Sequence, residues 1–106
     1  MVQDEKRDFA KLEAKIARIK DLKEKAEKLI ELGKFYFLNE KYNEAIGKFK
    51  EASKIDEKNA EIYYNLGIVY ESKNLPDDAS QMYTKALELN PGHQLASKHL
   101  EKIVGK

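Results

Sequence analysis

The 106-residue sequence has no cysteine and only two prolines, Pro76 and Pro91. Without thiols the chain can form neither a disulfide nor a thiolate metal site, and a cysteine-free composition is typical of a reducing compartment. Because no proline or glycine occurs before Gly33, nothing in the first 32 residues interrupts a helix. We therefore expect a cytoplasmic chain whose fold depends on side-chain packing alone.

Long apolar runs and an excess of one charge are also missing. No stretch approaches the roughly 18 apolar residues that a membrane span requires, and the start, MVQDEKRDFAKLEAK, lacks the apolar region of a signal peptide. The 20 basic and 19 acidic side chains leave a formal net charge of +1. Such a balance gives no electrostatic reason to bind nucleic acid or a membrane surface, and we expect neither partner.

No pattern typical of an enzyme is present. The two histidines, His93 and His99, are six residues apart, which places them on opposite sides of a helix. A metal site would need carboxylates from elsewhere, and the many acidic residues fit solvated helix faces better than a catalytic acid and base. The five glycines are scattered and form no phosphate-binding loop. We expect a chain that is not an enzyme and holds no metal or cofactor.

The apolar residues follow helical spacing throughout, and the strand signal is negligible. Asn59 is a good N-cap, Asn74 can adopt the left-handed conformation that ends a helix, and Pro76 fits a first helical turn. The sequence thus predicts an all-α fold with one modest core. The expected helices are 4–39, 42–54, 60–73, a segment from Pro76 to the Asn90-Pro91-Gly92 stop, and 93–104.

The sequence matches itself when it is shifted by 34 residues. In this alignment seven positions match in character, with small residues aligned with small ones and aromatic residues with aromatic ones. The first copy contributes Leu29, Leu32, Gly33, Tyr36, Ala45, Phe49 and Ala52, and the second Tyr63, Leu66, Gly67, Tyr70, Ala79, Tyr83 and Ala86.

This period and pattern resemble the tetratricopeptide repeat, W-x2-L-G-x2-Y…A-x3-F…P. The second copy has Tyr63 for the Trp and Tyr83 for the Phe, and the first has Leu29 for the Trp and Glu57 where the Pro would fall. The resemblance implies an α-α superhelix in which Gly67 lets two helices approach, so that Gly67→Leu should overpack them. The expected parts are an N-terminal extension (1–25), repeats (26–59 and 60–93) and a closing helix (94–106) that covers repeat two with Leu95, Leu100 and Ile103.

Members of this family generally hold a peptide or a partner helix in a concave groove. The resemblance therefore implies a protein interaction module, and three lysines favour an acidic ligand. Asn65 is the strongest candidate, because its amide can bond the backbone of an extended peptide. The clamp for chaperone C-termini is largely missing, with Ile30 and Lys34 at two of its positions. The implied groove residues are Ile30, Lys34, Phe37, Tyr64, Asn65, Ile68, Lys98 and Lys102.

The N-terminal extension carries a separate apolar stripe at 3-4-3 spacing, which is typical of a coiled-coil seam. On a straight helix this stripe would line up with the groove residues of repeat one. Either a second chain covers it in a homodimer, or the helix bends near residues 21–23 and caps its own repeat; order only on partner binding is a third alternative. The alternative function is a homo-oligomerisation module, in which the N-terminal helix or a second chain fills the groove. The stripe consists of Phe9, Leu12, Ile16 and Ile19.

Overall fold

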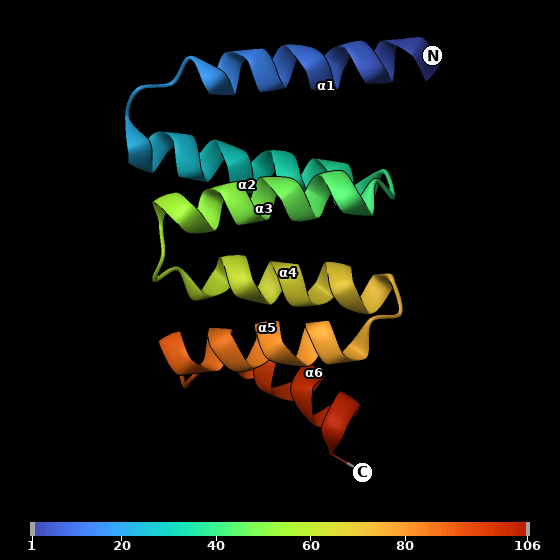
Figure 1. Cartoon of the computed structure of the whole chain (residues 1–106), viewed down its shortest axis with the longest axis vertical. Coiled ribbons are helices and arrows are strands. Elements are labelled where there is room, and N and C mark those ends of the chain that lie inside the picture. The colour runs from blue at the N-terminus through green and yellow to red at the C-terminus, as the bar shows by residue number, and fades with distance from the viewer. Residues whose placement is uncertain (1, 106) are drawn as a thin grey trace.

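A computed structural model describes the backbone of residues 2–105 and the side chains of residues 9–105. Within this part of the chain the structure is all-helical, as predicted. The first five helices lie across the long axis of a flat molecule of 44 × 31 × 17 Å, and the last helix runs obliquely at the end of that axis opposite the first (Figure 1). They are α1 (Val2–Ala17), α2 (Leu22–Leu38), α3 (Tyr42–Ile55), α4 (Ala60–Ser72), α5 (Pro76–Leu89) and α6 (Gln94–Val104).

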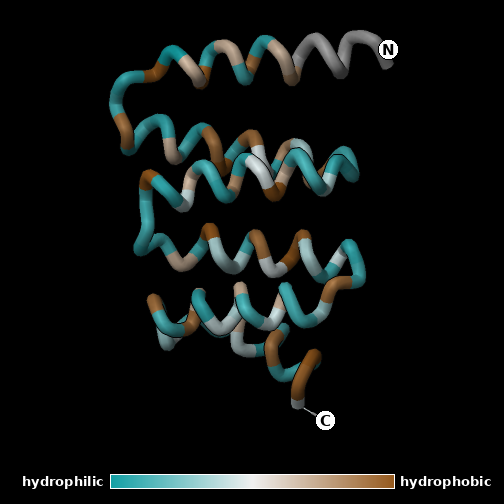
Figure 2. The backbone as a smooth tube through the Cα atoms, viewed as in Figure 1, coloured by the Kyte–Doolittle hydropathy of each residue, from teal (hydrophilic) through white to brown (hydrophobic). Residues whose placement is uncertain are grey.

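Two antiparallel hairpins, α2–α3 and α4–α5, form the centre of the molecule, with α1 against α2 and α6 against α5. Apolar and polar segments alternate along α2 to α6 and along the coloured part of α1, as amphipathic helices require (Figure 2). One group of buried side chains comes from all four of the helices α1, α2, α3 and α4, and a second comes from α5 and α6. Each hairpin therefore shares its core with the helix on either side, which is how stacked helical repeats are stabilised.

The helix boundaries of the repeats confirm the predicted caps. The Asn59 side chain accepts a hydrogen bond from the Glu61 backbone N–H at 3.0 Å, and Pro76 is the first residue of α5. Asn74 has a φ of 61°, and so has Glu40 in the corresponding turn of the first hairpin. Both hairpins therefore place a residue with left-handed backbone conformation at the same position of the turn. In the first hairpin this residue is a glutamate and not the asparagine that usually favours this conformation.

Of the two arrangements that the sequence left open for residues 4–39, the continuous helix is wrong and the break is correct, because α1 ends at Ala17 and α2 begins at Leu22. The last turn of α1 is tightened by the Ile19 N–H, which donates to the Ile16 carbonyl at 3.1 Å. Asp21 then caps α2 by accepting from the Glu24 N–H at 2.9 Å. The chain reverses here without proline or glycine, because the reversal lets α1 bury part of its apolar stripe on α2.

The prediction for the closing helix is correct for two of its three covering residues. Leu100 and Ile103 pack against the second core group, together with the fully buried Ala96. Leu95, by contrast, is 52% exposed. Ala96, Leu100 and Ile103 follow 4-3 spacing on one face of α6, and Leu95 is rotated about 100° away from Ala96.

The close approach within each hairpin depends on a glycine facing an aromatic ring. A Cβ atom added to Gly33 would lie 2.6 Å from Phe49 Cε1, and one added to Gly67 would lie 2.4 Å from Tyr83 Cε1. Both aromatic side chains are fully buried and cannot move aside without disturbing the core.

We predict that Gly67→Ala lowers the free energy of unfolding by about 1–3 kcal/mol, because the methyl group overlaps the Tyr83 ring. Gly47→Ala is the matched control, since an added Cβ at this exposed position in α3 meets no atom within 4 Å. This control should raise the stability by about 0.5–1 kcal/mol. Urea unfolding followed by circular dichroism measures both, and equal effects of the two substitutions would contradict the assigned contact.

Candidate ligand-binding groove

The α2–α4 groove is a hollow of about 330 Å³ between the first helices of the two repeats. It brings together five of the eight predicted groove residues. The other three lie outside its lining: Ile30 packs against the first core group, and Lys98 and Lys102 are exposed on α6. The lining consists of Lys34, Phe37, Leu38, Phe49, Tyr64, Asn65, Ile68 and Val69.

Aromatic contacts fix both walls of this groove. On the α2 side, the Phe37 ring lies 5.6 Å from that of Tyr42. On the α4 side, the Tyr64 ring contacts the rings of His93 and His99, with ring centroids 4.8 Å and 5.8 Å away. Burial, with the nearby carboxylates of α4, raises the pKa of Tyr64, so its phenol stays neutral. The groove is therefore a preformed apolar surface.

Asn65 provides the polar group within these apolar walls. Its Nδ2 atom is buried, yet it has no hydrogen-bond partner within the described part of the chain. Leaving a buried donor unpaired costs about 1–3 kcal/mol, so nearly all such groups in folded proteins have a partner. The residue as a whole is only half-buried and belongs to the groove lining, so a turn of its amide would let Nδ2 meet an acceptor brought by a ligand.

A polar cluster that the sequence did not reveal lies beside this groove. The Glu71 carboxylate accepts hydrogen bonds from the Tyr83 hydroxyl and from His99 Nδ1, the latter at 2.8 Å. Burial opposes the charged form of Glu71, but these two hydrogen bonds, together with the nearby basic groups of His99 and Lys102, outweigh it and lower the pKa of Glu71. The signal for the cluster was Tyr83 itself, because a tyrosine at the buried Phe position of the motif needs an acceptor for its hydroxyl.

A second hollow, the α1–α2 hollow, has a volume of about 600 Å³. Here the structure places the N-terminal stripe: Phe9 and Ile16 are buried, while Leu12 and Ile19 border the hollow. The extension thus folds back on its own repeat, as in the capping alternative, one of the three drawn from the sequence. The lining consists of Leu12, Lys15, Ile16, Ile19, Glu24, Lys28, Glu31, Leu32 and Phe35.

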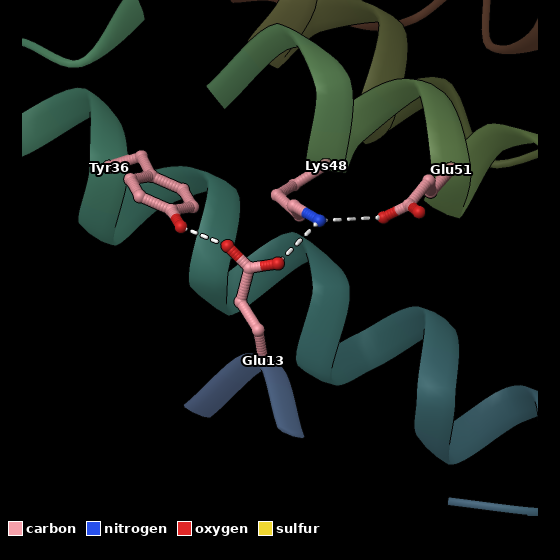
Figure 3. A network of polar contacts seen from close by, with 4 residues as sticks. All are labelled: Glu13, Tyr36, Lys48 and Glu51. Carbon is pink, nitrogen blue, oxygen red and sulfur yellow. Dashed lines mark hydrogen bonds and ion pairs between the residues drawn. The ribbon is translucent and has the colours of Figure 1, made fainter. Parts of the chain in front are cut away.

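A polar network fastens α1 to the first hairpin (Figure 3). The Glu13 carboxylate accepts from the Tyr36 hydroxyl and, at 3.0 Å, from Lys48 Nζ, which also pairs with Glu51 at 3.2 Å. Next to it, the Phe9 ring stacks on Tyr36 with centroids 4.2 Å apart. The network and the stacked rings together position α1 on both α2 and α3.

The charges of this network support one another. The hydrogen bond from Tyr36, with help from Lys48, lowers the pKa of Glu13 despite its partial burial. Burial and the neighbouring carboxylate raise the pKa of Tyr36, which therefore remains a hydrogen-bond donor. Burial opposes the charge on Lys48, but its two acidic partners outweigh this and raise its pKa.

Neither a metal centre nor a membrane span is found in the part of the chain that the structure describes. No three histidine, aspartate or glutamate side chains gather there in a way that could hold a metal ion. Among the same residues, no helix has the length and apolar character needed to cross a membrane.

Comparisons with known proteins agree with the repeat pattern. Residues 33–74 match the family model described as "TPR repeat", and residues 60–93 match the one described as "Tetratricopeptide repeat". No curated protein matches the chain. Among solved structures, the one titled "Crystal structure of MamA" is similar, with a TM-score of 0.73 and 29% identity over 76% of this chain. The match covers 47% of that protein, so this chain spans about half its length.

We predict that the Glu13 network stabilises the fold only while its carboxylate is charged. Because folding lowers the pKa of Glu13, the contribution is complete above the ordinary value of 4.5 and is lost as the pH falls below it. Urea unfolding at several pH values should therefore show wild type more stable than Glu13→Gln near neutrality, with the difference shrinking in acid. Glu57→Gln, at an exposed position between α3 and α4, is the control and should show no comparable difference.

Proposed function

The chain belongs to the tetratricopeptide repeat family, and from this premise we propose that it is a non-enzymatic module that binds an extended peptide in the α2–α4 groove. Repeats of this family support protein–protein interaction in general, and the groove is the surface of this chain best suited to it. A partner helix is the other ligand that such a surface can hold. The reducing environment expected from the cysteine-free sequence favours a cytoplasmic setting.

The unpaired Asn65 amide is the observation that carries this proposal. A peptide lying along the groove offers a backbone carbonyl every few ångströms, and one of them can accept from Nδ2. The apolar side chains of Phe37 and Ile68 border the same hollow and would receive apolar side chains of the ligand. The hydrogen bond from Asn65 to the peptide backbone would fix the position of the peptide along the groove. The apolar contacts would determine which peptide side chains are accepted.

The charge at the groove favours an acidic peptide. Lys34 is exposed and belongs to the groove lining, so a ligand carboxylate can pair with it there. Lys98 and Lys102, the other two lysines implied by the family resemblance, are exposed on α6 and lie outside this lining. Because Lys102 also acts on the carboxylate of Glu71, part of its charge is already compensated within the protein.

We predict that Asn65→Ala weakens peptide binding without lowering stability. Peptides selected from a displayed random library on the immobilised protein would serve as probes, with affinities measured by isothermal titration calorimetry. Loss of one hydrogen bond of about 0.5–1.5 kcal/mol should raise Kd roughly 2- to 12-fold, whereas removing an unpaired buried donor leaves the melting temperature unchanged or higher.

Asn43→Ala is the matched control, because it also replaces an asparagine by alanine but at an exposed position of α3. This substitution should leave Kd unchanged. The proposal would be contradicted by a library that yields no binding peptide, or by Asn65→Ala binding as tightly as wild type.

The α1–α2 hollow favours a second candidate function, assembly with another copy of the chain. Leu12 and Phe35 face this hollow while 36% and 39% exposed, which is unusual for large apolar side chains lining a concave surface. Its charged rim contains two lysines and two glutamates, so a second copy of this nearly neutral chain meets no net repulsion. In this arrangement Phe9 and Ile16 support α1 from within, and Leu12 and Ile19 make the contact.

We predict that the doubly substituted chain Leu12→Gln/Phe35→Gln sediments as a monomer at concentrations where wild type forms a dimer. Val104→Gln is the control, because Val104 is an exposed apolar residue on α6, away from the hollow. Analytical ultracentrifugation over a concentration series measures this. A wild-type chain that stays monomeric throughout, or a dimer that survives the double substitution, rules this function out.

A further inference from the structure

The closing helix α6 begins with an uncommon cap. His93 occupies the N-cap position, and its Nδ1 atom accepts a hydrogen bond from the Ala96 backbone N–H at 3.1 Å. Serine, threonine, aspartate and asparagine are the usual caps, and all of them accept hydrogen bonds at any pH near neutrality. An imidazole nitrogen can accept only while it carries no proton. The cap of α6 therefore exists only in one protonation state of His93.

The neutral ring is satisfied at both nitrogens. Since Nδ1 is the acceptor, the proton resides on Nε2, which lies 3.3 Å from Glu61 Oε1 and can donate to it. The ring is only 11% exposed and packs against Tyr64. From α4 it therefore faces Glu61 and the neutral Tyr64 phenol, and Lys98 and Glu101 of α6 border the hollow beside it.

A second proton on this ring breaks the cap. Nδ1 then becomes a donor that points at the Ala96 N–H, another donor, and the first turn of α6 loses its acceptor. The new positive charge also stands at the positive end of the helix dipole. Glu61 gains a charged partner, but its side chain is half exposed, so this gain is small.

The other histidine of α6 responds in the opposite sense. His99 Nδ1 faces the Glu71 carboxylate, which can only accept, so this nitrogen carries the proton when the ring is neutral. Protonation of the ring adds a positive charge next to Glu71 and strengthens the contact. Around His99 lie Glu71 and Tyr64 of α4 and Tyr83 of α5.

We infer that His93 is a proton-sensitive latch, that is, an N-cap that is lost when its ring is protonated. In mild acid the first turn of α6 then opens, while the His99–Glu71 contact holds the rest of α6 on α4. Opening withdraws the His93 ring from Tyr64, which is one wall of the α2–α4 groove. The latch concerns α6 itself and does not require the proposed peptide binding.

Amide hydrogen exchange measured by NMR on the full chain tests this latch. The protection factor of the Ala96 N–H should fall about fivefold between pH 8 and 5 in wild type, as expected for loss of one cap. His93→Asn supplies a cap that does not titrate, so its Ala96 protection should stay constant, while His99→Gln should keep the wild-type fall. A constant or rising protection in wild type, or an undiminished fall in His93→Asn, overturns the inference.

The tautomers of the two rings give a test that needs no substitution. Nitrogen chemical shifts of the wild-type protein at neutral pH should show the Nε2–H tautomer for His93 and the Nδ1–H tautomer for His99. Finding the Nδ1–H tautomer for His93 would mean that its ring cannot cap α6, and the latch would be excluded.

Discussion

The contact between a glycine and an aromatic ring sets the spacing on which the rest of the structure depends. Phe49 lies against Gly33 and Tyr83 against Gly67, so the two helices of each hairpin approach more closely than any side chain at those positions would allow. The same Phe49 ring borders the α2–α4 groove. The contact that closes the first hairpin thus also forms part of the surface proposed to bind a peptide, and any change in hairpin spacing alters that surface.

Both end helices are fastened to the hairpins by the same combination of a tyrosine hydroxyl, a glutamate and a basic group. At the N-terminal end Glu13 takes hydrogen bonds from Tyr36 and Lys48, and at the C-terminal end Glu71 takes them from Tyr83 and His99. Lys48 is held in its charged form by its acidic partners. A histidine, by contrast, changes charge near neutrality. The basic partner in the α1 attachment is therefore a lysine, whereas the one in the α6 attachment is a histidine.

The sequence allowed the hairpins to be predicted because their determinants are local or periodic. The matched residues 34 positions apart, together with Asn59 and Asn74, define helices that the structure confirms. The break between α1 and α2 has no such signal, because it depends on the burial of Phe9 and Ile16 on a helix that follows them. For the same reason the Glu71 cluster was missed: its members come from three helices and are joined only by the fold. Five of the eight groove residues implied by the family resemblance do lie together, since helical spacing alone places them on one face of α2 or α4.

Helix α2 separates the two hollows, and this position determines how the proposed functions relate. Lys34, Phe37 and Leu38 border the α2–α4 groove, whereas Leu32 and Phe35 border the α1–α2 hollow. No residue is common to the two linings, so a peptide in one and a second chain in the other would not compete for side chains. They would be linked through the rotation of α2, which Tyr36 fixes by stacking on Phe9 and bonding to Glu13. Peptide binding and self-assembly are therefore compatible uses of one rigid helix, and neither excludes the other.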